Sequence, residues 1–188
     1  FRRNLGIGRI TMKLAFLGDL HYGVRNDSEV FYNLQRVFFT EVFFPELKAR
    51  GITKVIQVGD FFDRRQYINF KTLYYLKDYL PQLLEEYNIE MYVLIGNHDT
   101  ALKSSNHINS PSLLLSDIPH ITVLENLCHL SLVEEDETFN ISVIPWINNH
   151  NYKESIDFIA NTPHQYVVGH FELKGFEMQR GHVSESGM

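Results

Sequence analysis

The sequence has little of what builds extracellular or membrane-spanning proteins. Cys128 is the single cysteine among 188 residues, which excludes a disulfide framework and a thiolate zinc site. No apolar run approaches the roughly 20 residues that cross a bilayer. No charged segment followed by an apolar one opens the chain, as a secretion signal would. These absences predict a cytoplasmic protein without a membrane anchor.

An excess of positive charge is also missing. The chain has 17 Lys and Arg against 23 Asp and Glu, giving a formal net charge of -6, and this disfavours non-specific attraction to nucleic acid. Bound divalent cations would reverse the sign locally. The charge balance therefore does not exclude a nucleic-acid partner if the protein binds divalent cations.

One pattern occurs four times: a short apolar run, then glycine, then a side chain of metal-ligand type. The runs are Leu14–Leu17 before Gly18-Asp19-Leu20-His21, Lys54–Val58 before Gly59-Asp60, Met91–Ile95 before Gly96-Asn97-His98-Asp99, and Tyr166–Val168 before Gly169-His170. In open α/β sheets, ligands bind beyond the carboxyl ends of the strands. If the four runs lie side by side, their ligand-type residues converge on one edge, with Asp60 in the middle. The glycines are expected to allow sharp turns or close backbone approach.

These residues form a ligand set without thiolate. Asp19 and His21 are two apart, so in an extended chain they point the same way. Mixed oxygen and nitrogen ligands suit manganese or iron, and less often zinc. One ion would take Asp19, His21 and Asp60, and a second would take Asp60, Asn97 and His170. Such a pair suits in-line displacement at phosphorus and generates hydroxide near neutral pH.

Further residues near the motifs are candidates for the chemistry. His98 follows a ligand directly and points elsewhere in an extended segment, so we expect it to be the general acid for the leaving oxygen. Asp63 is the candidate partner that orients His98, and Arg64 and Arg65 are candidates for a phosphate clamp. Each motif alone is also typical of an ordinary turn. The order of all four at strand ends favours the functional interpretation.

The rest of the pattern predicts one α/β domain in which strands and helices alternate before a strand-rich middle. Asn26-Asp27-Ser28 offers N-cap chemistry to a helix marked by apolar residues at helical spacing and ended near Gly51. Pro81 is expected to kink or split the next helix. The expected strands are 13–17, 55–58, 90–95, 121–124, 127–133, 139–144 and 165–168, with short helices near 111–115 and 153–160. Residues 1–11 are expected to be an upstream or poorly ordered extension, and residues 12–188 one domain that is incomplete at its C-terminus.

The motif order Asp19-x-His21, Gly59-Asp60-x-x-Asp63, Gly96-Asn97-His98-Asp99 and Gly169-His170 resembles the calcineurin-like metallophosphoesterase superfamily. Within it, 17–24, 144–146 and 168–176 are similar to the SbcD-type recombination nucleases, and among these to their T-even-type phage members. The resemblance implies a layered fold with central mixed β-sheets flanked by helices. It also implies two manganese ions bridged by Asp60, and protonation of the leaving group by His98.

By resemblance, the activity is exonuclease and endonuclease cleavage of DNA in recombination and double-strand-break processing. The implied partners are DNA, a coiled-coil ATPase of the SbcC type and a second copy of the chain. The family ends its site with Gly-His-x-His, whereas Gly181-His182-Val183-Ser184 has serine at the last position. The chain as given is therefore expected to be weakly active or inactive. The alternatives are a metallophosphatase acting on a phosphoprotein or nucleotide, and a non-catalytic scaffold subunit.

Overall fold

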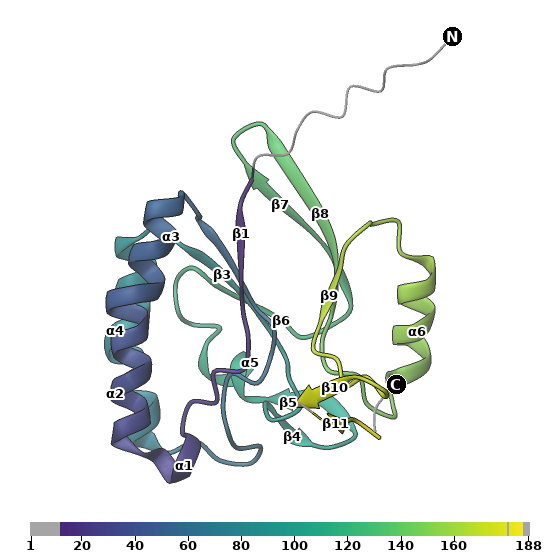
Figure 1. Ribbon diagram of the computed structural model, residues 1–188, viewed down its shortest axis with the longest axis horizontal. Coiled ribbons are helices and arrows are strands. Elements are labelled where there is room, and N and C mark those ends of the chain that lie inside the picture. Colours follow the sequence, from purple (N-terminus) through teal and green to yellow (C-terminus); the bar gives the residue numbers. More distant parts are fainter. Residues whose placement is uncertain (1–11, 180, 186–188) are drawn as a thin grey trace.

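The protein has two facing β-sheets enclosed between helices (Figure 1). The computed structural model describes residues 12–179 and 181–185, so the expectation for residues 1–11 lies outside the described part. One apolar cluster fills the space between the first sheet and helices α2 to α4, and a second lies between the sheets. The predicted fold class, central mixed sheets flanked by helices, is confirmed.

The first sheet contains four parallel strands in the order β1-β2-β3-β6. Their bounds are β1 Leu14–Leu17, β2 Lys54–Gln57, β3 Glu90–Leu94 and β6 Ile121–Leu124. All four residues of β2 are buried, as expected for a strand covered on both faces. Because the strands are parallel, their carboxyl ends share one edge, and β2 lies between β1 and β3 as predicted.

Helices cover the outer face of this sheet. They are α1 Val24–Asp27, α2 Glu29–Val37, the π-helical η1 Phe38–Phe43, α3 Phe44–Arg50 and α4 Phe70–Glu86. Gly51 caps α3 with a φ of 65°, confirming the expected end. Of the two outcomes expected at Pro81, a kink or a split, the split does not occur, because α4 continues through the proline. Leu80, Leu83 and Leu84 are buried on either side of the proline, and this packing offsets the lost backbone hydrogen bond.

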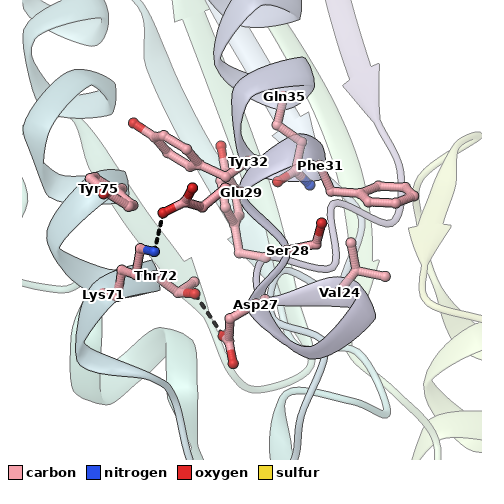
Figure 2. A pocket seen from close by; sticks show the side chains of 12 residues that line it. Val24, Asp27, Ser28, Glu29, Phe31, Tyr32, Gln35, Lys71, Thr72 and Tyr75 are labelled. Atoms are coloured by element: carbon pink, nitrogen blue, oxygen red, sulfur yellow. Dashed lines mark hydrogen bonds and ion pairs between the residues drawn. The ribbon is translucent and has the colours of Figure 1, made fainter.

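The N-cap predicted within Asn26-Asp27-Ser28 is correct in position, but the side-chain hydrogen bond expected of it is not formed. Ser28 occupies the N-cap position of α2 but makes no side-chain cap bond, and Arg25 and Asn26 have left-handed backbone angles. The Asp27 carboxylate instead accepts a 2.7 Å hydrogen bond from the Thr72 hydroxyl (Figure 2). This side chain is used to tie the α1 turn to α4, so it cannot also cap α2.

An apolar stripe on α2 and η1 faces away from the core. Phe31 is 41% exposed, Leu34 60% and Val42 54%. On the same helical layer, Tyr67, Phe70 and Tyr74 are also exposed. We use the name helical apolar surface for the following set: Val30, Phe31, Leu34, Val37, Phe38, Val42, Tyr67, Phe70 and Tyr74. The helical spacing was predicted correctly, but these residues do not belong to the core.

The second sheet has the order β7-β8-β9, with β7 Cys128–Glu134, β8 Glu137–Ile144 and β9 Val167–Gly169. Helix α6, Tyr152–Asn161, connects β8 to the parallel β9 and packs on this sheet through the stacked rings of His129 and Phe158. The fourth apolar run therefore lies in a different sheet from the other three. The expectation that all four strands lie side by side is wrong, because a short apolar run does not encode which sheet it joins.

Short elements complete the described chain. The antiparallel pair β4 Thr100–Leu102 and β5 Ser105–Asn109 leads into α5 Ser110–Leu114, and β10 Glu177–Gln179 pairs with β11 His182–Val183. The sequence pattern indicated α5 but neither of these strand pairs. Across residues 12–179 and 181–185, every helix is too short or too polar to cross a membrane.

Candidate metal centre

The predicted ligands gather around Asp60, at the carboxyl edge of the first sheet. Asp60 is 5% exposed, and its two carboxylate oxygens face different imidazoles. Oδ2 lies 3.7 Å from Nε2 of His21, and Oδ1 lies 3.6 Å from Nε2 of His170. One carboxylate thus stands between the imidazoles of two different loops.

The first predicted group is assembled as expected. Asp19, His21 and Asp60 each offer a ligand atom, and these atoms lie within 4.8 Å of one another. His21 and Asp60 have positive φ angles of 46° and 54°, which cost free energy in residues other than glycine. The amide of His21 donates to the Asp60 carbonyl at 3.0 Å. This bond holds the loops after β1 and β2 together despite the strain.

The second predicted group is assembled across the two sheets. The His170 ring donates from Nδ1 to the Val58 carbonyl at 2.9 Å, which turns Nε2 toward Asn97 Oδ1, also at 2.9 Å. The amide of His170 donates to the Ile144 carbonyl of β8. These bonds explain how a residue from the second sheet reaches the edge of the first.

The donor set fits a cation. With Nδ1 donating, Nε2 of His170 carries a lone pair, and it faces the Asn97 oxygen and the Asp60 carboxylate. Acceptors that converge without a proton between them repel one another unless a positive charge lies among them. If the Asn97 amide is turned over, its NH2 group instead donates to Asp60 and His170. Nδ1 of His21 is buried and lacks a hydrogen-bond partner among the described residues. Asp60, Asn97 and the imidazoles of His21 and His170 are thus suited to divalent metal.

Three of the four glycines before the ligands are required by close packing. A Cβ on Gly59 would lie 2.6 Å from Nδ1 of His170, and one on Gly96 would lie 2.1 Å from the Asp60 nitrogen. A Cβ on Gly169 would lie 2.6 Å from the Ile144 carbonyl oxygen. Gly18 has no neighbour within 4 Å of such an atom. The predicted need for glycine is therefore confirmed for the three loops that pack together and is wrong at Gly18.

His98 lies beside the first group. Its amide donates to Asp60 Oδ1 at 2.8 Å, and its ring is edge-on to His21 at a centroid distance of 4.9 Å. Nδ1 lies 2.7 Å from the backbone carbonyl of Asp63, so this nitrogen donates. The Asp63 carboxylate instead lies 3.5 Å from Nδ1 of His21. Asp63 thus holds His98 through its main chain, whereas the sequence had suggested its carboxylate.

The comparisons with known proteins agree with this geometry. Residues 12–185 match the family model described as calcineurin-like phosphoesterase. The chain belongs to the calcineurin-like phosphoesterase family. It is also 33% identical over 170 residues to "Exonuclease subunit 1" of Enterobacteria phage T4, which covers 90% of this chain and 48% of that protein. The chain therefore spans about half the length of this relative.

The two arginines predicted to clamp phosphate differ in their surroundings. Arg64 donates to Asp27 at 2.8 Å and to Asn26 at 3.1 Å. Arg65 donates to the Thr100 hydroxyl at 3.0 Å and lies over the Trp146 ring. Arg64 would have to leave an ion pair to meet a phosphate. Arg65 would give up weaker contacts, so of the two it is better placed to serve as a clamp.

The sequence reasoning assigned no role to Asp99, although its motif was recognised. Its fully buried carboxylate accepts from the backbone N–H groups of Phe61, Phe62 and Gly96, at 3.2, 3.0 and 2.8 Å. Burial raises the pKa of Asp99 to about 6, while these three hydrogen bonds oppose the shift. Asp99 thereby fastens the Asp60 loop of the phosphoesterase to the Asn97 loop. A carboxylate directly after a ligand motif was the available signal.

Proposed function

We propose that this phosphoesterase is a metal-dependent DNA nuclease that hydrolyses phosphodiester bonds, with residues 12–188 working as one domain. The observation that carries the proposal is the position of Asp60 between His21 and His170. Asp19 and His21 would complete one ion site with Asp60, and Asn97 and His170 would complete the other. The preferred ions are two manganese ions, because the ligands mix oxygen and nitrogen without thiolate.

The residues around these sites have separable roles in the proposed reaction. When bound, the ions would polarise the phosphodiester and lower the pKa of water. His98 would donate a proton from Nε2 to the leaving oxygen, since Nδ1 is already held by the Asp63 carbonyl. Arg65 would neutralise a phosphate oxygen. The chain thus contributes ligands, a proton donor and an anion clamp.

The choice of DNA rests on the relative. That protein is named an exonuclease subunit, so we propose that this chain also cleaves DNA and works beside a partner subunit. The partner of the resembling nucleases is a coiled-coil ATPase of the SbcC type. We further propose a homodimer that acts in the cytoplasm of the host cell.

A comparison of substrates tests the proposal. With manganese, the protein should hydrolyse DNA and the phosphodiester bis(p-nitrophenyl) phosphate much faster than the monoester p-nitrophenyl phosphate. A preference for monoesters, with DNA left intact, would favour a metallophosphatase. Binding of manganese without hydrolysis of any of the three would favour a scaffold subunit.

A further inference from the structure

A polar pocket of about 360 Å³ borders the segment that follows β8 and has no role in the function proposed above. Its walls come from β5, from the loops that follow β6 and β8, and from the start of α6. The loop after β6 leaves the same carboxyl edge of the first sheet as the ligand loops, and β6 is the neighbour of β3. Its volume falls within the range of pockets that hold small organic groups.

The floor of the pocket is built from asparagine side chains that form hydrogen bonds with one another and with the backbone. Asn148, only 6% exposed, donates from its side chain to Asn106 Oδ1 at 3.0 Å. The side-chain oxygen of Asn151 accepts a hydrogen bond from the backbone N–H of Asn148 at 2.7 Å. Both Asn106 and Asn151 donate to the Trp146 carbonyl, at 2.8 and 3.1 Å. These bonds satisfy the amides within the protein, so the floor is preformed.

The same peptide segment connects the floor to the metal centre. The Trp146 amide donates to the Ile95 carbonyl at 2.8 Å, and Ile95 lies two residues before Asn97. The backbone carbonyl of Ile144, two residues before Trp146, accepts a hydrogen bond from the backbone N–H of His170. One short segment, residues 144–146, thus lines the pocket and also forms hydrogen bonds with Ile95 and His170, near the second ligand group.

The exposed side chains of the pocket indicate what it binds. Asn126, His107, His150 and Glu154 line it, and none of these side chains has a hydrogen bond to the described residues. They offer amide, imidazole and carboxylate groups to a ligand. Glu125, also in the wall, adds a second carboxylate. Two carboxylates repel phosphate but accept from the amino groups of nucleobases.

We propose that this pocket holds one nucleobase of the DNA strand, close to the phosphate that is cleaved. The proposal deepens the nuclease function and rests on it. Glu154 accepts from a ring or exocyclic N–H of the base, and Asn126 supplies a second polar contact. A base drawn out of its stack exposes these edges. The pocket would thereby position the strand without contributing to the chemistry.

Binding and hydrolysis are measured separately to test the pocket. The first probe is a single-stranded oligonucleotide with phosphorothioate linkages, in which an abasic nucleotide replaces each position in turn. Its affinity is measured by fluorescence anisotropy with manganese. The second probe is bis(p-nitrophenyl) phosphate, which has no base. The variants are Glu154→Gln and Asn126→Ala, and Asp157→Asn is the matched control, one turn later on α6 and outside the pocket.

In the wild type, an abasic nucleotide at one position should weaken binding about tenfold, the size of one good base contact. Glu154→Gln should weaken binding of the intact strand by a similar factor. For this variant, an abasic nucleotide at the same position should change the affinity little. Asp157→Asn should match the wild type, and all variants should hydrolyse bis(p-nitrophenyl) phosphate at the wild-type rate.

The proposal is wrong if no abasic position changes the affinity, or if Glu154→Gln and Asp157→Asn behave alike. Position-dependent binding by a wild type that hydrolyses no phosphodiester would support the pocket while rejecting the nuclease function.

Discussion

At the scale of single residues, the site depends on side chains that bind no metal. Asp99 receives three backbone N–H groups from two different loops. The relative position of the Asp60 and Asn97 loops therefore depends on a buried carboxylate that is not among the proposed ligands. The geometry of the ligands is fixed by this buried acceptor as well as by the strands.

Replacing Asp99 with asparagine should loosen the site. The NH2 group of the asparagine would face a backbone N–H that the carboxylate now accepts. A buried donor without a partner costs about 1–3 kcal/mol. We expect a lower melting temperature in calorimetry, together with weaker manganese binding. Asp117→Asn is the control, because the Asp117 side chain is 72% exposed and pairs only with Lys77 at the surface. If both variants bind manganese like the wild type, Asp99 does not position the ligands.

His98→Ala should separate binding from chemistry. Loss of a positioned general acid costs about 10²–10⁴-fold in rate, whereas the number of bound ions should not change. The structure also allows an alternative in which His98 binds metal, since possible ligand atoms of His21, Asp63 and His98 lie within 4.8 Å of one another. Turnover and manganese content are measured on the same sample. A parallel loss of both would make His98 a ligand.

The sequence indicated which residues gather at the site better than it indicated what holds them in place. Asp60 and Asn97 were recognisable because each follows an apolar run and a glycine. The supports of His98 and His170 are backbone carbonyls, those of Asp63 and Val58, and every residue type has such a carbonyl. Their roles depend on how loops pack, which no local pattern encodes.

At the scale of elements, the ligand loops come from strands of both sheets. The parallel strands of the first sheet were predictable from their apolar runs. The β4–β5 pair was missed because Ser105–Asn109 is polar and lacks a buried alternating face. Helix α2 was recognised by its spacing, yet its apolar residues are exposed because Phe39 and Phe44 of the next turns fill the core instead.

The helical apolar surface gives the proposed homodimer a location. Helices α2 and α4 lie together through the stacked rings of Tyr32 and Tyr75, 4.4 Å apart, so their exposed residues can form one contact area. Exposed apolar patches of this kind often mark protein interfaces. Tyr75 is partly buried in this stack, so Tyr74 is the better target for substitution.

Leu34→Asp combined with Tyr74→Asp should convert dimers to monomers in sedimentation velocity. Both side chains are well exposed, so circular dichroism should show an unchanged fold. Val133→Asp on the β7 strand introduces the same charge at another exposed apolar residue and should leave the dimer intact. Dimers that persist in the double variant would place the interface on another surface.

At the scale of the whole molecule, acidity and metal binding are connected. A net charge of -6 opposes the approach of DNA until divalent ions are bound near the site. The chain also spans about half of its phage relative.

The most direct measurement is a calorimetric titration of manganese into the wild-type protein and Asp60→Ala, with phosphodiesterase activity followed in parallel. Asp60 stands between His21 and His170, so its loss should remove both ion sites and the activity together. The wild type should bind two ions per chain. Two tightly bound ions in Asp60→Ala would contradict a metal centre organised around Asp60.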